Sequence, residues 1–186
     1  MTKEIDFYFD FISPYAYLAH KKIQLLPKDI KINYKPILLG GLHNLEGITA
    51  PAFIKPKLKH MINDCLLIAK KNNHDFKWNS IFPINSLNIM RGCFDINLSN
   101  RDPYIETMFN AYWKYDLDIS KEEILIPLLE QCKIDKDIFF KTIKDPVIKE
   151  KLKDATKNAH EKEVFGAPTF IVNNKIFWGQ DRLEFA

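Results

Sequence analysis

The sequence predicts an α/β protein whose strands lie at the two ends of the chain, with an all-helical segment between them. In residues 5–10, Ile5, Phe7 and Phe9 alternate with acidic side chains, which is the period of a strand rather than a helix. Near the other end, apolar runs at 169–172 and 176–178 flank a polar turn, a pattern typical of a hairpin. We therefore expect an α/β domain formed by residues 1–40 and 145–186, interrupted by an inserted helical domain at 41–144.

The first strand leads directly into a helix start at Ser13. Serine is a favoured N-cap, and Pro14 occupies the first helical position, where proline is preferred; the helix is expected to run to about residue 26. The free backbone N–H groups and the positive end of the helix dipole would stabilise an anion beside the Ser13 hydroxyl. The alternative is that Ser13 only caps the helix, as many serines do.

The remaining elements follow from periodicity and from start signals. A second strand is expected at 30–36, where apolar and polar residues alternate. Asp145 followed by Pro146 repeats the cap-then-proline pattern. Helical patterns cover residues 56–71, 85–98, 103–115, 121–132, 135–144 and 146–163, and a last helix is expected to begin at residues 180–181.

Pro168 stands at the entrance of the apolar run 169–172 and is a candidate cis proline. Gly166 gives the backbone latitude ahead of it, and Ala167 is then able to present its N–H and C=O groups to an extended peptide ligand. An edge-strand proline that binds no ligand is an equally good interpretation of Pro168 taken alone.

Taken together, these features resemble the thioredoxin superfamily. The run FDFISPYAYL at 9–18 and the run WGQDRL at 178–183 are similar to motifs of the 2-hydroxychromene-2-carboxylate isomerase and kappa-class glutathione transferase family. Lys57, His60, Met61 and Asp64 match a middle pattern of that family, with histidine where the family usually has tyrosine. The resemblance spans nearly the whole chain and implies a thioredoxin-like fold, a mixed sheet with flanking helices, carrying the inserted helical lobe.

The resemblance implies glutathione as cofactor and Ser13 as the catalytic residue that activates its thiol. Ala167 beside Pro168 is then expected to pair with the cysteinyl backbone of the tripeptide. Gln180 and Asp181 are expected at its γ-glutamyl end, where the Asp181 carboxylate would hold the α-amino group. An ordinary N-cap is the alternative role for Asp181. Lys57 is expected to pair with a glutathione carboxylate, and its alternative is a solvated surface lysine.

One position departs from the family pattern. Ile48 stands where close relatives carry an asparagine that helps to bind the tripeptide, with Thr49 adjacent. An isoleucine side chain makes no hydrogen bond, so either Thr49 substitutes or affinity falls by roughly one neutral hydrogen bond, ~0.5–1.5 kcal/mol.

The function implied is a glutathione-dependent isomerase of 2-hydroxychromene-2-carboxylate type, acting on a small aromatic or electrophilic substrate. Phe11 and Tyr15 flank Ser13 and are the candidate substrate-binding residues. The alternatives are a kappa-class-like glutathione transferase or peroxidase, and a non-catalytic glutathione- or peptide-binding module. The resemblance also implies a homodimer.

Composition argues against several other classes. The 27 basic and 24 acidic residues are spread along the chain, so no basic stripe favours nucleic acid, and no apolar run approaches a membrane span. The start of the chain is unlike a secretory signal, and we expect a cytoplasmic protein. Three widely spaced cysteines and five unpaired histidines predict neither a disulfide nor a metal site. The two cysteine positions of dithiol oxidoreductases correspond to Ser13 and Ala16, so disulfide exchange is not expected.

Overall fold

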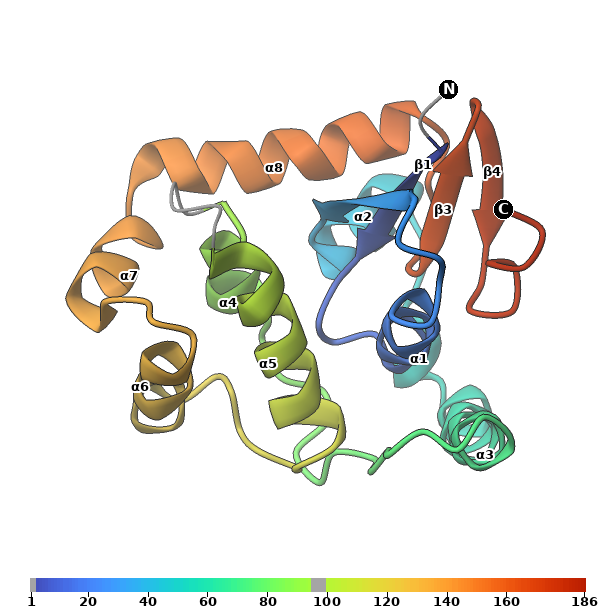
Figure 1. The fold of residues 1–186 in the computed structure, drawn as a ribbon, viewed down its shortest axis with the longest axis horizontal. Helices are drawn as coiled ribbons and strands as arrows, with labels where there is room; N and C mark the ends of the chain where they lie inside the picture. The colour runs from blue at the N-terminus through green and yellow to red at the C-terminus, as the bar shows by residue number, and fades with distance from the viewer. Residues whose placement is uncertain (1–2, 95–99) are drawn as a thin grey trace.

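The computed structural model describes residues 3–94 and 100–186, and within them it contains one four-stranded mixed sheet of order β2-β1-β3-β4 (Figure 1). The strands are β1 (Lys3–Phe9), β2 (Ile30–Pro36), β3 (Thr169–Val172) and β4 (Lys175–Trp178). β1 pairs parallel with β2 and antiparallel with β3, and β3 pairs antiparallel with β4. The predicted α/β fold with a mixed sheet is therefore confirmed.

The C-terminal hairpin follows from its turn residues. Asn173 and Asn174 have φ angles of 49° and 61°, a left-handed conformation that asparagine tolerates better than most residues. Two consecutive positive φ angles twist a two-residue loop in the sense that matches the twist of the flanking strands. Lys175, expected in the turn, is instead the first residue of β4 and pairs with Val172.

The other regular elements of the described chain are helical. They are α1 (Pro14–Ile23), α2 (Leu39–Glu46), a 3-10 turn (Pro51–Phe53), α3 (Lys55–Lys71), α4 (Leu87–Gly92), α5 (Arg101–Trp113), α6 (Glu122–Gln131), α7 (Lys136–Thr142) and α8 (Pro146–Glu161).

Three expectations about helices were wrong or incomplete. The helix expected at 85–98 is shorter: α4 ends at Gly92, residues 93–94 form a turn, and 95–98 lie outside the described residues. Helix α2 was not expected, and it ends at Gly47, whose φ of 66° suits a residue without a side chain. Residues 180–185 form successive turns rather than the expected last helix, as the bond from the Arg182 amide to the Gly179 carbonyl shows.

The two faces of the sheet are covered by different helices. Phe7 and Phe9 point to one face, where they pack in a core with α1 and with Phe109 of α5. Tyr8 points to the opposite face and packs with Leu42 of α2 and Ala159 of α8. Successive side chains of β1 thus point to opposite faces of the sheet. Because helices cover both faces, β1 is buried on both sides.

All four strands lie within 1–40 and 145–186, and the described residues of 41–144 are helical or irregular, as expected for an inserted lobe. The expected boundary after residue 40 falls inside α2. The division of the chain into two domains remains a prediction.

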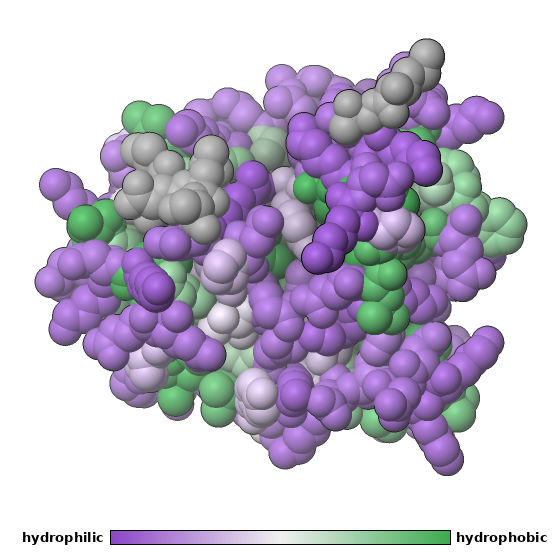
Figure 2. Space-filling model, viewed as in Figure 1, coloured by the Kyte–Doolittle hydropathy of each residue, from purple (hydrophilic) through white to green (hydrophobic). Residues whose placement is uncertain are grey.

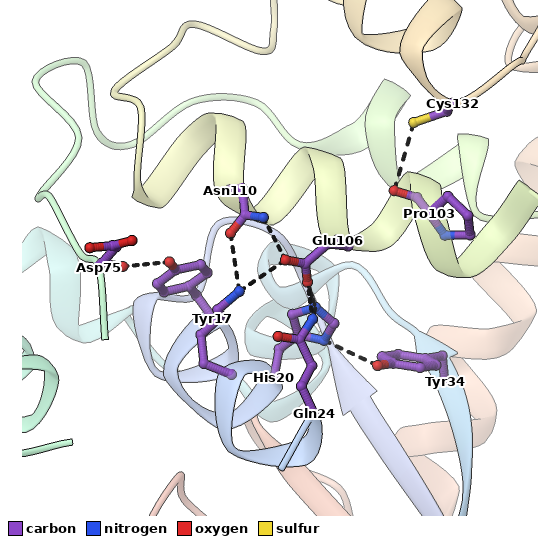
Figure 3. A network of polar contacts seen from close by, with 10 residues as sticks. Tyr17, His20, Gln24, Tyr34, Asp75, Pro103, Glu106, Asn110 and Cys132 are labelled. Carbon is purple, nitrogen blue, oxygen red and sulfur yellow. Dashed lines mark hydrogen bonds and ion pairs between the residues drawn. The ribbon is translucent and has the colours of Figure 1, made fainter. Parts of the chain in front are cut away.

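A polar network ties α1 to α5 (Figure 3). Burial lowers the pKa of His20, whose Nε2 lies 2.6 Å from the Glu106 carboxylate. Burial opposes ionisation of Glu106, but the hydrogen bonds from His20 and Lys21 outweigh it, and its pKa lies well below the ordinary value. A neutral His20 that donates to Glu106 and accepts from the Tyr34 hydroxyl at 3.1 Å fits all these contacts. The network fixes α1, the helix that begins at the candidate site.

Hydrophilic residues predominate on the face shown in Figure 2, with hydrophobic ones scattered between them. Within residues 3–94 and 100–186, no helix has the length and hydropathy needed to cross a bilayer.

Candidate functional site

The structure brings Ser13 and the Pro168 segment together. The Ser13 hydroxyl accepts a hydrogen bond from the Ala16 amide at 3.2 Å, which makes Ser13 the N-cap of α1 as predicted. The same hydroxyl donates to the Ala167 carbonyl at 2.9 Å. Ser13 is only 4% exposed, so this contact between segments 154 residues apart is shielded from bulk water.

The peptide between Ala167 and Pro168 is cis, as the sequence predicted. The Pro168 carbonyl accepts from the Gly179 amide at 3.0 Å, which joins the entrance of β3 to the segment that follows β4. The backbone of Ala167 therefore stands beside the start of α1 on one side and beside residues 179–182 on the other.

A groove of about 530 Å³ lies along this backbone. It falls in the size range of pockets that bind small ligands. The N-terminal part of the chain contributes α1 and α3, and the C-terminal part contributes the segments around Pro168 and after β4. The lining residues are Tyr15, Asp64, Ile68, Ala167, Pro168, Trp178, Gly179, Gln180, Asp181 and Arg182.

Tyr15 and Asp64 meet inside the groove, where the Tyr15 hydroxyl donates to the Asp64 carboxylate at 2.8 Å. Burial, together with the bond to Asp64, raises the pKa of Tyr15 far above its ordinary value, so the phenol stays protonated at neutral pH. Tyr15 was expected beside the substrate, whereas its bond to Asp64 was not expected, although Asp64 belongs to the middle motif that resembles the family pattern.

Gln180, in the segment after β4, lines the groove and carries an unsatisfied polar atom. Gln180 is 9% exposed, and within the described chain its Oε1 atom has no hydrogen-bond partner. A buried oxygen without a partner is costly, and a ligand that donates a hydrogen bond would remove the cost. Asp181 next to it is exposed and forms an ion pair with Arg182 at 3.2 Å. An exposed pair of this kind gains little and can be exchanged for another cation.

Three predicted site residues are not among those that line the groove: Ser13, Phe11 and Lys57. Ser13 adjoins the groove through the hydrogen bond of its hydroxyl to the Ala167 carbonyl. Phe11 is fully buried, and its ring packs against Phe9, Tyr104 and Phe109 in the core. The structure thus gives the Phe11 ring a packing role rather than the expected contact with substrate. Lys57 is exposed on α3 and precedes Asp64 by seven residues, which places it on the same helix face roughly 10 Å away along the axis.

Ile48 is 48% exposed after the end of α2, and neither Ile48 nor Thr49 lines the groove. The two alternatives, that Thr49 substitutes for the family's asparagine or that affinity for glutathione falls, remain predictions.

A buried acid adjoins the site and was not predicted as part of it. Asp10 is fully buried, three residues before Ser13, and burial raises its pKa to about 6. The signal in the sequence is a carboxylate between Phe9 and Phe11, in a run too apolar for a solvated side chain. Such a group is either paired or functional.

None of the three cysteines lines the groove. Cys65, Cys93 and Cys132 are free and buried, and burial raises the pKa of the Cys65 thiol to about 12. Thiols of this kind are inert toward exchange. Among the residues that the structure describes, no group of three His, Cys, Asp or Glu side chains is arranged to hold a metal ion.

A mixed sheet, a polar residue at the start of the first helix and a cis proline beside it define a thioredoxin-fold protein with serine in place of the redox cysteine. Residues 4–186 match the family of DSBA-like thioredoxin domains. The chain belongs to this family, together with the 2-hydroxychromene-2-carboxylate isomerases and the kappa-class glutathione transferases.

Individual relatives narrow the class. The chain is 30% identical to a 2-hydroxychromene-2-carboxylate isomerase of Sphingobium xenophagum over 189 residues, covering 100% of this chain and 96% of that protein. It is 39% identical over 69 residues to glutathione S-transferase kappa 1 of Caenorhabditis elegans, covering 36% of this chain and 30% of that protein. A solved structure of 2-hydroxychromene-2-carboxylate isomerase superposes with a TM-score of 0.89 at 26% identity, covering 98% and 91% of the two chains. The protein is an enzyme with an isomerase-like or glutathione-transferase-like function.

Proposed function

We propose that this protein is a glutathione-dependent isomerase of 2-hydroxychromene-2-carboxylate type in which Ser13 activates the cofactor thiol. The observation that carries the proposal is the hydrogen bond of 2.9 Å from the Ser13 hydroxyl, at the N-terminus of α1, to the carbonyl of Ala167 beside the cis Pro168. Such a helix start favours an anion, and the Ala167 backbone lies in the groove where a peptide is able to pair with it.

The residues of the groove fit a tripeptide with two carboxylates and one ammonium group. The unpartnered Oε1 of Gln180 accepts a hydrogen bond, and the exposed Asp181 carboxylate binds a cationic amine in place of Arg182. Lys57, further along the face of α3 that carries Asp64, is suited to a carboxylate at the other end. Ala167 offers backbone groups between them.

Glutathione, when bound, supplies the thiolate nucleophile that adds to the substrate and leaves again. The task of the protein is to make that thiolate available near neutral pH. Ser13 has one hydroxyl proton, and in the structure it points to the Ala167 carbonyl. In the proposed complex the hydroxyl turns to the sulfur, and the Ala167 carbonyl accepts from the bound peptide instead. The Ser13 hydroxyl and the Ala167 carbonyl therefore each keep one hydrogen bond when glutathione binds.

Transferase activity is the second candidate, because part of the chain is similar to a kappa-class glutathione transferase. It would use the same Ser13 geometry on a different electrophile. The enzyme relatives favour either catalyst over the non-catalytic binding module. The homodimer and the cytoplasmic location remain predictions.

The proposal is tested by ultraviolet difference titration with reduced glutathione, with S-methylglutathione as the control that has no ionisable thiol. We expect thiolate absorbance to appear below the pKa of a free thiol, about 8.5, and to be lost in Ser13→Ala. The absence of thiolate at saturating glutathione would refute the proposed role of Ser13.

The two catalytic candidates differ in what happens to glutathione. With 2-hydroxychromene-2-carboxylate as substrate, an isomerase gives the ring-opened isomer while the glutathione concentration stays constant. A transferase consumes one glutathione for each product molecule. Turnover of this substrate only with stoichiometric loss of the thiol would replace the first candidate with the second.

A further inference from the structure

Asp10 joins the turn that carries Ser13 to two helices that are distant in sequence. Its Oδ1 accepts a hydrogen bond from the Ile12 amide at 3.1 Å. Its Oδ2 accepts from the Leu39 amide at 2.8 Å and from the Ser86 hydroxyl at 3.1 Å. Leu39 is the first residue of α2, and Ser86 directly precedes α4. A single buried side chain therefore links β1, α2 and α4 at the point where the Ser13 turn begins.

The backbone of Asp10 holds the same turn from the other side. The Ser13 amide donates to the Asp10 carbonyl at 3.0 Å, while the Asp10 side chain holds Ile12. These two bonds restrain the turn. The direction of the Ser13 hydroxyl follows from the turn, because Ser13 is fixed in an extended conformation, with φ −84° and ψ 114°, as the cap of α1.

We infer that Asp10, in its carboxylate form, is the positioning residue that keeps the Ser13 hydroxyl where the sulfur of bound glutathione is expected. The inference rests on the proposed function. The two oxygens of Asp10 face Ile12, Leu39 and Ser86 and do not line the groove, so Asp10 acts through the turn. Displacement of a reacting group by about 1 Å is enough to cost ~10²-fold in rate, so a small shift of the turn matters.

Proton uptake by Asp10 would disturb this arrangement. A carboxylate accepts at both oxygens, whereas a protonated carboxyl group has one oxygen that must donate. The backbone amides of Ile12 and Leu39 cannot accept a hydrogen bond, and only the Ser86 hydroxyl is able to reverse its role. Protonation therefore weakens the hold on the Ser13 turn or on the start of α2.

At neutral pH the titratable groups packed around Asp10 carry no charge, whereas Asp10 is a carboxylate. Burial raises the pKa of Asp10 to about 6, and three hydrogen bonds to the charged form offset part of that effect. Cys93 beyond α4 and Tyr112 on α5 are the titratable groups coupled to it, and burial raises the pKa of both. His43 lies on α2, where burial lowers its pKa. All three are uncharged at pH 7, so Asp10 is the acid in this part of the core that changes charge.

The first test follows the backbone amide resonances of Ile12, Ser13 and Leu39 by NMR during a pH titration of the protein without glutathione. We expect the three to share one midpoint near pH 6, and Asp10→Asn to abolish the transition. Ser86→Ala removes one bond to the charged form, so the midpoint should rise by roughly 0.5–1 pH unit. Ser120→Ala, at an exposed serine bonded to Asp118, is the matched control and should leave it unchanged.

The second test measures the thiol pKa of glutathione in the complex by thiolate absorbance. If Asp10 positions Ser13, Asp10→Asn should raise that pKa and leave ~10-fold less thiolate at a given pH, with glutathione affinity within about 3-fold. Electrostatic repulsion between the Asp10 carboxylate and the thiolate predicts the opposite sign. A lower thiol pKa in Asp10→Asn would therefore overturn the inference.

The two tests separate the inference from the proposed function. If the wild-type protein forms no thiolate but its three amides titrate together, the proposed function is refuted, while the conclusion that Asp10 restrains the Ser13 turn stands. Amides that titrate independently, or a midpoint that Ser86→Ala does not move, overturn the inference. Should Asp10→Asn fail to fold, the Ser86→Ala midpoint decides the question.

Discussion

The hydroxyl of Tyr15 donates a hydrogen bond of 2.8 Å to the carboxylate of Asp64, and both side chains line the groove. Tyr15 belongs to α1 and Asp64 to α3, so the bond joins the helix that begins at Ser13 to the first long helix of the inserted segment. A ligand in the groove lies against this bond, which makes its strength a determinant of the shape of the groove.

The first prediction concerns this pair. A double-mutant cycle with Tyr15→Phe and Asp64→Ala, measured by urea unfolding at pH 7, should give a coupling free energy of about 1–2 kcal/mol, because the acceptor is charged and partly buried. A cycle with Tyr115→Phe in place of Tyr15→Phe is the control and should show no coupling. Coupling within error of zero for Tyr15 and Asp64 would mean that the bond does not hold the two helices together.

Removal of the Ser13 hydroxyl should have a small effect on stability and a large effect on activity. Ser13→Ala is expected to lower the free energy of unfolding by about 1 kcal/mol through loss of the cap. It should lower isomerase turnover by ~10²–10³, as for the loss of one donor to a developing anion. Ser13→Thr keeps a hydroxyl and a cap and is the control. Wild-type turnover in Ser13→Ala would contradict the catalytic role.

The cysteines should be dispensable. Cys65, Cys93 and Cys132 are buried, so a thiol reagent such as Ellman's reagent should label none of them in the native protein at pH 7 and all three in urea. Glutathione-dependent turnover should survive pretreatment with this reagent once the excess is removed. Loss of activity on labelling would restore a thiol mechanism of the oxidoreductase type.

Gly166 is required by the position of the Trp178 indole. A Cβ atom at Gly166 would lie 2.6 Å from Trp178 Nε1, so Gly166→Ala must displace the indole, which lines the groove. We expect changed tryptophan fluorescence and a loss of about 1 kcal/mol in the free energy of unfolding.

The matched control for this change is Gly40→Ala in α2, where a Cβ meets no atom within 4 Å. It should stabilise the protein by about 0.5–1 kcal/mol, since alanine is the better helix former. The penalty at Gly166 should shrink in a Trp178→Leu background. An unchanged penalty there would place its cause in the backbone rather than in the indole.

Asp10 also makes stability depend on pH. Its folded pKa of about 6 lies above the ordinary 3.8, so its stabilising contribution is present below pH 3.8 and is lost as the pH rises through about 6. Relative to Asp10→Asn, the free energy of unfolding of the wild type should fall by about 3 kcal/mol over this window, as measured by urea unfolding. A difference that stays constant with pH would show that Asp10 is not a buried acid of raised pKa.

The fold and much of the site were predictable because their signals are local. Ser13 and Pro14 show a helix start, and the two asparagines before β4 show a tight turn, each through the backbone preferences of the residues themselves. The proximity of Ser13 to Ala167 has no local signal, and it followed only from the family resemblance.

The features that the sequence did not predict, or predicted wrongly, have physical causes. Helix α2 begins after Leu38, which supplies no side-chain cap, and contains Gly40 and Gly41, so its stability comes from packing against α8 rather than from propensity. Phe11 was assigned to substrate because it lies near Ser13 in the sequence, but its ring packs against Phe9 and Phe109 in the core, a tertiary contact that has no local signal. Asp10 was missed because the partners of its carboxylate, Leu39 and Ser86, are set by tertiary structure.

The pairing of β1 with β3 has a consequence for synthesis of the protein. Asp6 stands opposite Ile171, so β1 acquires its second neighbour in the sheet only after the more than 150 residues between these two positions have been synthesised. Until then the nascent chain exposes an apolar edge, which is the kind of surface that chaperones bind and that drives aggregation. Removal of the β3–β4 hairpin would therefore deprive the chain of one wall of the groove and of its protection from aggregation at the same time.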